Sequence, residues 1–157
     1  MIRSTRLTSA VVLASFAAPF ALAAHTHLAI PSTWTLNLKE SDFGGVPTPA
    51  SETFALLADN EKRASYTDVT VDAAGKTWNS RWSGAADGAP HPITGLPGAT
   101  FSTNAATDVS VMVFPDGMTQ TCNFSLTHNK KKFVETCIAK TTDGKSYNQH
   151  LVFDRVK

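Results

Sequence analysis

The chain has 157 residues, 42% of them hydrophobic, and a formal net charge of +1. The 14 basic and 13 acidic residues nearly cancel, which excludes the large excess of Lys and Arg that drives nucleic-acid binding. This length suits one domain with a core of its own.

Residues 1–23 have the pattern of a secretory signal peptide. Arg3 and Arg6 precede an apolar run over 7–24, and the run passes through a small-x-small sequence at 21–23. A basic start, a short apolar run and such a cleavage pattern are typical of a signal peptide. We expect cleavage after Ala23 and a periplasmic or secreted location. No later segment has the ~20 apolar residues of a membrane span, so we expect none.

The mature chain, residues 24–157, is expected to be a single domain and a monomer. Its 134 residues keep 12 of the 14 basic residues and all 13 acidic residues, so its formal net charge is −1. Neither repeats nor a linker that would mark a second domain interrupt it.

Two histidines lie close to the predicted cleavage site. Cleavage one residue later, after Ala24, would leave His25-Thr26-His27 at the amino terminus. A free amine, two amide nitrogens and an imidazole ring form a square-planar set suited to Cu(II) or Ni(II). Cleavage after Ala23 removes this arrangement and leaves two solvated side chains. His25 and His27 are therefore candidate metal ligands for the later cut alone, and we expect no other cofactor.

The mature sequence alternates between apolar and polar residues with a period of two. Trp34, Leu36 and Leu38 form the first such stripe. Further stripes are Val69 with Val71, Trp78 with Ser80 and Trp82, Val109 with Val111 and Val113, and Tyr147 with Leu151 and Phe153. Alternation of this kind is typical of antiparallel strands with one buried face. Turn sequences at 74–76, 115–117 and 142–145 separate the stripes, so we predict an all-β antiparallel meander closed into a barrel or sandwich.

Two segments depart from the alternating pattern. Residues 48–58 begin with Thr48-Pro49 and continue with strong helix formers, so local propensity permits a helix as readily as a strand. Residues 84–98 are rich in Gly, Pro and Ala, and we predict a long loop there.

The two cysteines, Cys122 and Cys137, are expected to form one disulfide in an oxidising compartment. If the turn lies at Asn129-Lys130, residues whose numbers sum to 259 face each other. The two cysteines are then direct cross-strand neighbours, at a separation that a disulfide can span. One residue does not fit the apolar face of this hairpin: Glu135, opposite Phe124.

Three patches of the sequence resemble a known family. They are W-T-L-N over 34–37 with S-D-F over 41–43, P-H-P-I-T-G over 90–95, and the terminal V-F-D-R over 152–155. Together they resemble a widespread family of uncharacterised exported bacterial proteins. Its members open with W-x-L-N-x-x-x-S-x-F, carry a Y-P-[VI]-T-G loop and end in a strand that contains Tyr or Phe.

The resemblance implies a lipocalin-like β-barrel in the bacterial envelope, and a strand for residues 51–57. It brings no known activity and no catalytic residues. The sequence departs from the family pattern at Glu40, where lysine is usual, and at His91, where tyrosine is usual. The pair Cys122 and Cys137 is an addition.

An aromatic set is the candidate ligand-binding site: Trp34, Trp78, Trp82, Phe101 and Phe114. The interior of a barrel of about eight strands is either filled by side chains or holds one small ligand. Aromatic walls with a few polar groups suit apolar ligands. The alternative is that these rings are the packed core.

The leading functional hypothesis is an exported β-barrel that binds a small apolar or amphipathic ligand. The alternative is a protein-protein interaction module, such as an envelope inhibitor or stress partner, that would use the basic hairpin tip Lys130–Lys132 or the 84–98 loop. Enzymatic motifs are absent: neither G-x-S-x-G nor H-E-x-x-H occurs. The sequence therefore favours a binding protein over an enzyme, and no catalytic residue is assigned.

Overall fold

The structure is a computed structural model that describes residues 31–60, 62–127 and 129–156. The predicted signal peptide and the candidate metal ligands His25 and His27 lie outside the described residues. Within those ranges, no helix is long and apolar enough to cross a membrane.

The described residues form one antiparallel sheet of ten strands, in the order β4-β3-β2-β1-β10-β9-β8-β7-β6-β5. The strands are β1 (Ser32–Leu36), β2 (Ser51–Asp59), β3 (Arg63–Val71), β4 (Thr77–Ala85), β5 (His91–Pro92), β6 (Thr100–Asn104), β7 (Val109–Val113), β8 (Thr119–Leu126), β9 (Lys132–Lys140) and β10 (Ser146–Arg155). Strands that follow each other in the chain pair, except for β4 and β5, which form the two edges of the sheet, and β1 also pairs with β10. The predicted turns at 74–76, 115–117 and 142–145 each connect consecutive strands. The prediction of an all-β antiparallel meander is confirmed.

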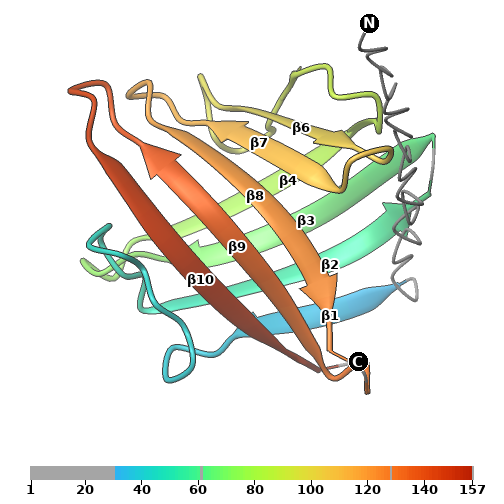
Figure 1. Cartoon of the computed structure of the whole chain (residues 1–157), viewed down its shortest axis with the longest axis horizontal. Coiled ribbons are helices and arrows are strands. Elements are labelled where there is room, and N and C mark those ends of the chain that lie inside the picture. Colours follow the sequence, from blue (N-terminus) through green and yellow to red (C-terminus); the bar gives the residue numbers. More distant parts are fainter. Residues whose placement is uncertain (1–30, 61, 128, 157) are drawn as a thin grey trace, which may run out of the picture.

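The two outer strands of this sheet approach each other and nearly close a barrel. Arg81 of β4 and Thr94 exchange two backbone hydrogen bonds of 2.9 Å. In Figure 1, β6 to β10 cross in front of β1 to β4, as two walls of one barrel. Gly95 permits the closure: its φ is +86°, and a Cβ there would lie 2.0 Å from the carbonyl oxygen of Asn79. The prediction of a long loop over 84–98 is therefore wrong in part, because this segment contains β5 and completes the barrel.

The segment with helix-forming residues is strand β2. It pairs with β1 on one side and with β3 on the other, and Phe54 faces Trp34 and Asp68 across these ladders. Two partner strands satisfy the backbone groups that a helix would satisfy internally, and tertiary pairing overrides a weak local propensity. The strand implied by the family resemblance is confirmed, and the local helix alternative is wrong.

The disulfide hairpin has the predicted register. Cys122 faces Cys137 with a Cα–Cα distance of 4.1 Å, and the bond is formed. Leu126 faces Phe133. Both cysteines are buried, at 5% and 1% exposed, so the disulfide belongs to the barrel interior.

Aromatic side chains fill parts of the interior in two clusters. The first contains the buried residues Trp34, Leu36, Cys122, Phe133, Cys137, Leu151 and Phe153. The second contains Ala64, Trp82, Ile93 and Ala99, with Tyr66 and Phe101 packed against it. These clusters define which face of each strand points inward.

Two of the valine stripes lie on the outer face of the barrel. Val69 is 42% exposed, whereas its neighbour Asp68 shares the inner face with Phe54. On β7, Ser110 is buried and pairs with Cys122, so the valines on either side of it face outward. The predicted period is correct at both sites, but part of the inner surface is polar.

Candidate functional site

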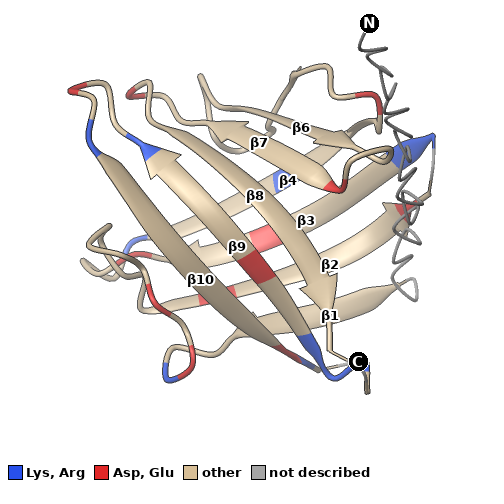
Figure 2. Ribbon diagram, in the orientation of Figure 1, with Lys and Arg blue, Asp and Glu red and all other residues tan. Residues whose placement is uncertain are grey.

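Three carboxylates from three strands share the inner face of the barrel. Glu52 of β2 lies two residues before Phe54, and Asp68 of β3 pairs directly with Phe54. Glu135 of β9 lies two residues after Phe133, whose ring centroid is 5.3 Å from that of Phe54. Figure 2 shows the corresponding acidic segments within β2, β3 and β9. The cluster therefore spans the lumen between two crossing walls.

Burial raises the pKa of each of these carboxyl groups. The pKa of Glu52 rises to about 8, first through burial and then through the charges of Asp68 and Glu135. The pKa of Glu135 rises to about 7, through burial and the charge of Asp68. Burial also raises the pKa of Asp68, although a 2.8 Å hydrogen bond from Thr70 opposes the rise. Because the three groups interact, they titrate as a coupled set.

The described part of the chain places no basic partner on this cluster. Among residues 31–60, 62–127 and 129–156, no salt bridge reaches Glu52, Asp68 or Glu135. Buried charges in proteins are normally paired or bound to a ligand. The unbalanced acidic charge is therefore available to protons or to a positively charged guest.

Tyr66 connects the acidic cluster to the second aromatic cluster. Its pKa is raised by burial and by the charges of Asp68, Glu135 and Glu52, so its hydroxyl remains a hydrogen-bond donor. The ring stacks on Trp82, with centroids 6.0 Å apart, and meets Phe101 edge to face at 5.2 Å. An aromatic wall thus borders the carboxylates.

Buried polar atoms without partners lie along the same wall. Nε1 of Trp82, Nε2 of His91 and Oδ1 of Asp68 have no hydrogen-bond partner within the described part of the chain. The Trp82 side chain is 1% exposed, and the His91 ring lies 6.2 Å from it. Trp82 pairs with Tyr66, two residues along β3 from Asp68. Since buried polar groups are almost always hydrogen-bonded, these atoms are free to exchange hydrogen bonds with buried water or with a bound molecule.

The interior is filled unevenly. Trp34 and Phe153 are 1% exposed and close-packed. In contrast, Phe54, Phe101 and Phe124 share the inner face but keep accessible surface, as do the three carboxylates. The inner face beside the acidic cluster is therefore less completely enclosed than the region around Trp34 and Phe153.

The structure separates the tryptophans that the sequence grouped. Trp34 belongs to the first aromatic cluster, where its Nε1 donates a 2.9 Å hydrogen bond to Ser32. Trp82 belongs to the second cluster, with the centroid of Phe101 4.9 Å away. Trp82 and Phe101 are therefore the candidate residues that border the acidic cluster.

Trp78 and Phe114 lie apart from both clusters. Trp78 is half-buried at the β3–β4 turn, where its Nε1 donates a 3.2 Å hydrogen bond to Asp72 and Nζ of Lys76 lies 3.5 Å from the ring centroid. Phe114 follows β7 directly, in the turn to β8. The structure does not bring these two rings together with Trp82.

Sequence reasoning missed most of the acidic cluster. Glu135 gave a signal, as the one residue that did not fit the apolar face of the disulfide hairpin. Asp68 was hidden because its neighbour Val69 offered a more obvious apolar stripe. Glu52 was hidden because the helix-like composition of its segment left the inward face undefined. Such inward carboxylates can be recognised in a sequence where Asp or Glu lies an even number of residues from an aromatic residue on the same predicted strand, because residues two apart share a face.

The disulfide prevents a metal site that the geometry would otherwise offer. The sulfur atoms of Cys122 and Cys137 and a carboxylate oxygen of Glu135 lie within 4.8 Å of one another. Both sulfurs are committed to the disulfide, and a disulfide lacks the thiolate that binds metals. In the oxidised protein, Glu135 therefore belongs to the carboxylate cluster alone.

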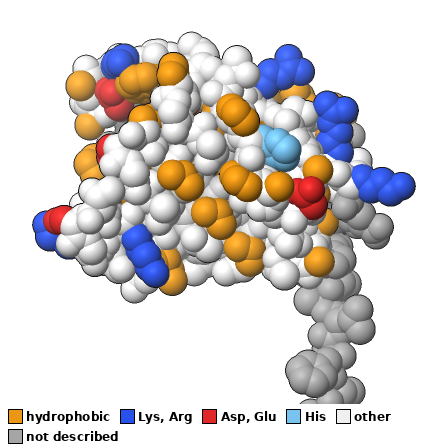
Figure 3. Space-filling view, turned by 90° about the horizontal axis from the view of Figure 1, so that it is seen from above, with side chains coloured by type: hydrophobic (Ala, Val, Ile, Leu, Met, Phe, Trp, Pro, Cys, Tyr) orange, Lys and Arg blue, Asp and Glu red, His pale blue; other side chains and the backbone are white. Residues whose placement is uncertain are grey.

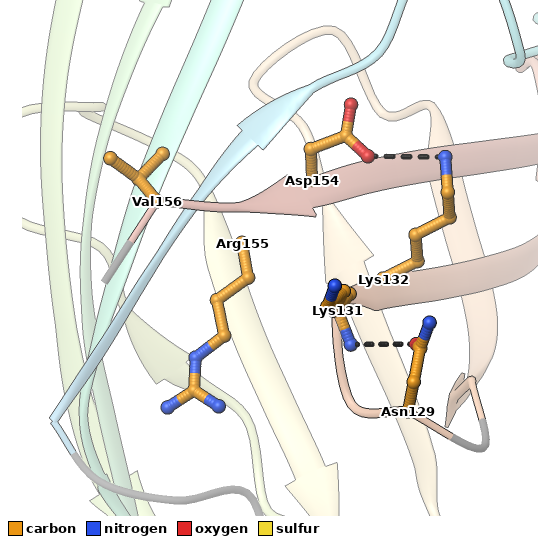
Figure 4. Close-up of a pocket in the computed structure, with 6 residues that line it drawn as sticks. All are labelled: Asn129, Lys131, Lys132, Asp154, Arg155 and Val156. Atoms are coloured by element: carbon orange, nitrogen blue, oxygen red, sulfur yellow. Dashed lines mark hydrogen bonds and ion pairs between the residues drawn. The ribbon is translucent and has the colours of Figure 1, made fainter.

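The basic hairpin tip carries less free charge than its sequence indicates. It borders a shallow open depression of about 550 Å³ at the end of β10 (Figure 4). The depression is lined by Asn129, Lys131, Lys132, Asp154, Arg155 and Val156. Nζ of Lys132 lies 2.6 Å from Glu40 and 3.1 Å from Asp154, and these contacts raise the Lys132 pKa, with the hydrogen bond to Glu40 first. This ion-pair network ties the hairpin to the β1–β2 connection.

Comparison of the chain with family models, curated proteins and solved structures returns no match. On the face seen in Figure 3, hydrophobic side chains lie mostly as separate spots among polar atoms. Scattered single apolar residues are normal on protein surfaces and mark no interface.

Proposed function

We propose that the protein is an exported β-barrel that binds a small amphipathic ligand in its lumen. The observation that carries the proposal is one inner wall on which accessible aromatic rings lie beside buried polar atoms without partners. Ligand sites in proteins combine apolar walls with a few fixed polar groups in this way.

The polar groups favour an amphipathic ligand over a purely apolar one. Tyr66 and Phe101 supply the apolar surface, whereas Asp68 and the indole N–H of Trp82 require hydrogen-bond partners. An aliphatic chain alone would leave those groups unsatisfied, and a buried group without a partner costs about 1–3 kcal/mol. A ligand with both an apolar body and a polar head satisfies the whole wall.

The test is titration of the mature protein with N-phenyl-1-naphthylamine, a dye that fluoresces in apolar sites, followed by displacement with octyl compounds. Ser80→Phe narrows the lumen, because Ser80 pairs with Asp68 on the inner face. Ser83→Phe is the matched control on the exposed outer face of the same strand. Thermal unfolding of both variants verifies that they fold.

We expect wild type and Ser83→Phe to bind the dye, and Ser80→Phe to lose at least about tenfold in affinity, because a filled site removes most contacts. Binding that is equal in all three proteins would place the dye on the outer surface. No dye binding and no binding of any octyl compound would refute a ligand-binding lumen.

A further inference from the structure

We propose that the lumen selects a cationic amphiphile, an amine with an apolar body, and that its ammonium group lies among Glu52, Asp68 and Glu135. This inference rests on the proposed function and specifies the chemical class of the ligand. It assigns the charged end of the ligand to the carboxylates and the apolar end to the aromatic wall.

The first argument is the placement of the carboxylates. Glu52 and Asp68 come from the neighbouring strands β2 and β3, whereas Glu135 comes from β9, which β1 and β10 separate from β2 in the sheet. The three carboxylates converge on the lumen beside the Phe54–Phe133 contact. No salt bridge joins them to another described residue. Carboxylates held on opposing walls offer an ammonium group several charge-assisted acceptors at once.

The second argument is independent of charge. Trp82 is 1% exposed, yet its indole N–H has no acceptor, and the buried Oδ1 of Asp68 has no donor. Both face the lumen at adjacent positions of β3 and β4. The structure thus provides one unused donor and one unused acceptor beside the carboxylates. An amine that also carries an oxygen, such as an amino alcohol, would match both.

The third argument concerns the apolar part of the ligand. Tyr66, Trp82 and Phe101 form a contiguous set of rings with centroid distances of 4.9–6.0 Å. Aromatic faces attract organic cations as well as apolar groups. They therefore favour an alkyl or aryl ammonium ion over a hydrated metal ion, which is held by oxygen ligands and water.

Binding of a cation here is coupled to protons. The titratable and charged side chains on the inner face are Glu52 and Asp59 of β2, Tyr66 and Asp68 of β3, His91 of β5, Glu135 of β9, and Tyr147 and Arg155 of β10. An ammonium group requires ionised carboxylates, so it displaces the protons that Glu52 and Glu135 hold near neutral pH. Affinity for the amine therefore falls as the pH decreases from 8 to 6.

The experiment compares three probes that share an eight-carbon alkyl chain and differ in the head group: octylamine, octanol and octanoate. Their binding is measured by calorimetry at pH 8 and pH 6. Glu135→Gln and Glu52→Gln remove one carboxylate each. Glu40→Gln is the matched control, because Glu40 lies outside the lumen and pairs with Lys132.

We expect octylamine to bind at least about tenfold more tightly than octanol at pH 8, and octanoate more weakly than either, since like charges repel. Either lumen variant should weaken octylamine about tenfold while octanol changes less than about twofold. Glu40→Gln should match wild type for all three probes. Octylamine should also lose about tenfold to a hundredfold in affinity between pH 8 and pH 6, because displacement of one proton lowers the affinity by up to a factor of ten for each pH unit.

Two results would overturn the inference. Equal affinity for octanol and octylamine in wild type would leave the proposed ligand-binding function standing and refute the selection of amines. Octylamine affinity that is unchanged in both lumen variants would place the amine elsewhere. If none of the three probes binds, the proposed function and this inference both fail.

Discussion

Replacement of Glu52 by glutamine should stabilise the protein at alkaline pH and leave it nearly unchanged at acidic pH. The pKa of Glu52 is raised from 4.5 to about 8 in the folded barrel, whereas the unfolded chain keeps the ordinary value. Between these values the folded protein holds a proton that the unfolded chain releases. Folding stability is therefore lost as the pH rises from 4.5 to about 8, because the unfolded state binds fewer protons. Glutamine has no proton to lose and removes this dependence.

The magnitude follows from the linkage. One pKa unit corresponds to about 1.4 kcal/mol, so a single dry carboxyl group of this kind would lose about 4 kcal/mol between pH 5 and pH 8. Glu52 keeps some accessible surface in the lumen, and water there solvates part of the charge. We therefore expect Glu52→Gln to gain about 2–3 kcal/mol over wild type at pH 8, and less than about 1 kcal/mol at pH 5.

The assay is urea unfolding at pH 5 and pH 8 without reductant, so that the disulfide stays closed. Asp143→Asn is the control, because the pKa of Asp143 is lowered by its hydrogen bonds to Lys145 and Thr141. Its ionised form stabilises the folded state, so the control should show no gain at pH 8. An equal effect of Glu52→Gln at the two pH values would show that Glu52 is not buried as an acid, and the electrostatic description of the lumen would be wrong.

The remaining predictions concern the frame around the lumen. Gly95→Ala should destabilise the protein by more than about 2 kcal/mol, because positive φ and a backbone clash combine. The control Gly75→Ala, with positive φ but no atom within 4 Å, should cost only about 1 kcal/mol. Equal melting temperatures of the two variants would contradict the closure at β4. Replacement of Cys122 and Cys137 by serine should cost about 3 kcal/mol in urea unfolding, and no loss would show that the hairpin is held without its disulfide. Val69→Thr should change stability by less than about 0.5 kcal/mol, as expected for an outward position; a loss of 2 kcal/mol would place Val69 in the core.

The sequence predicted the strands more successfully than the faces of those strands. The turns at 74–76, 115–117 and 142–145, the β8–β9 register and the disulfide depend on local chemistry, and all are as predicted. The identity of β2 depended on partner strands that are distant in the sequence. Local propensity could not decide it, because backbone pairing with β1 and β3 stabilises the strand only in the assembled sheet.

The candidate site was harder to predict, because on its strands polar residues face the interior at positions where the alternation led us to expect apolar residues. At Asp68 and Ser110 the polar residue faces inward and its valine neighbours face outward. Period-two alternation fixes which residues share a face, but it does not say which face is inside. In the disulfide hairpin, Cys122 and Phe133 identify the inner side, and there Glu135 was recognisable as the residue that did not fit.

Glu135→Gln tests whether the acidic cluster serves binding at the expense of stability. The pKa of Glu135 is raised to about 7, mainly by burial, so the ionised form weakens the folded state at pH 8. The amide should therefore stabilise the barrel at pH 8 by about 1–3 kcal/mol and weaken octylamine about tenfold. A residue that served only packing would lose stability when changed, and one that served only binding would not alter stability. Higher stability in urea unfolding together with weaker octylamine binding in calorimetry is expected only if the fold keeps a buried acid where a cation binds. A variant that loses both stability and binding would refute this explanation.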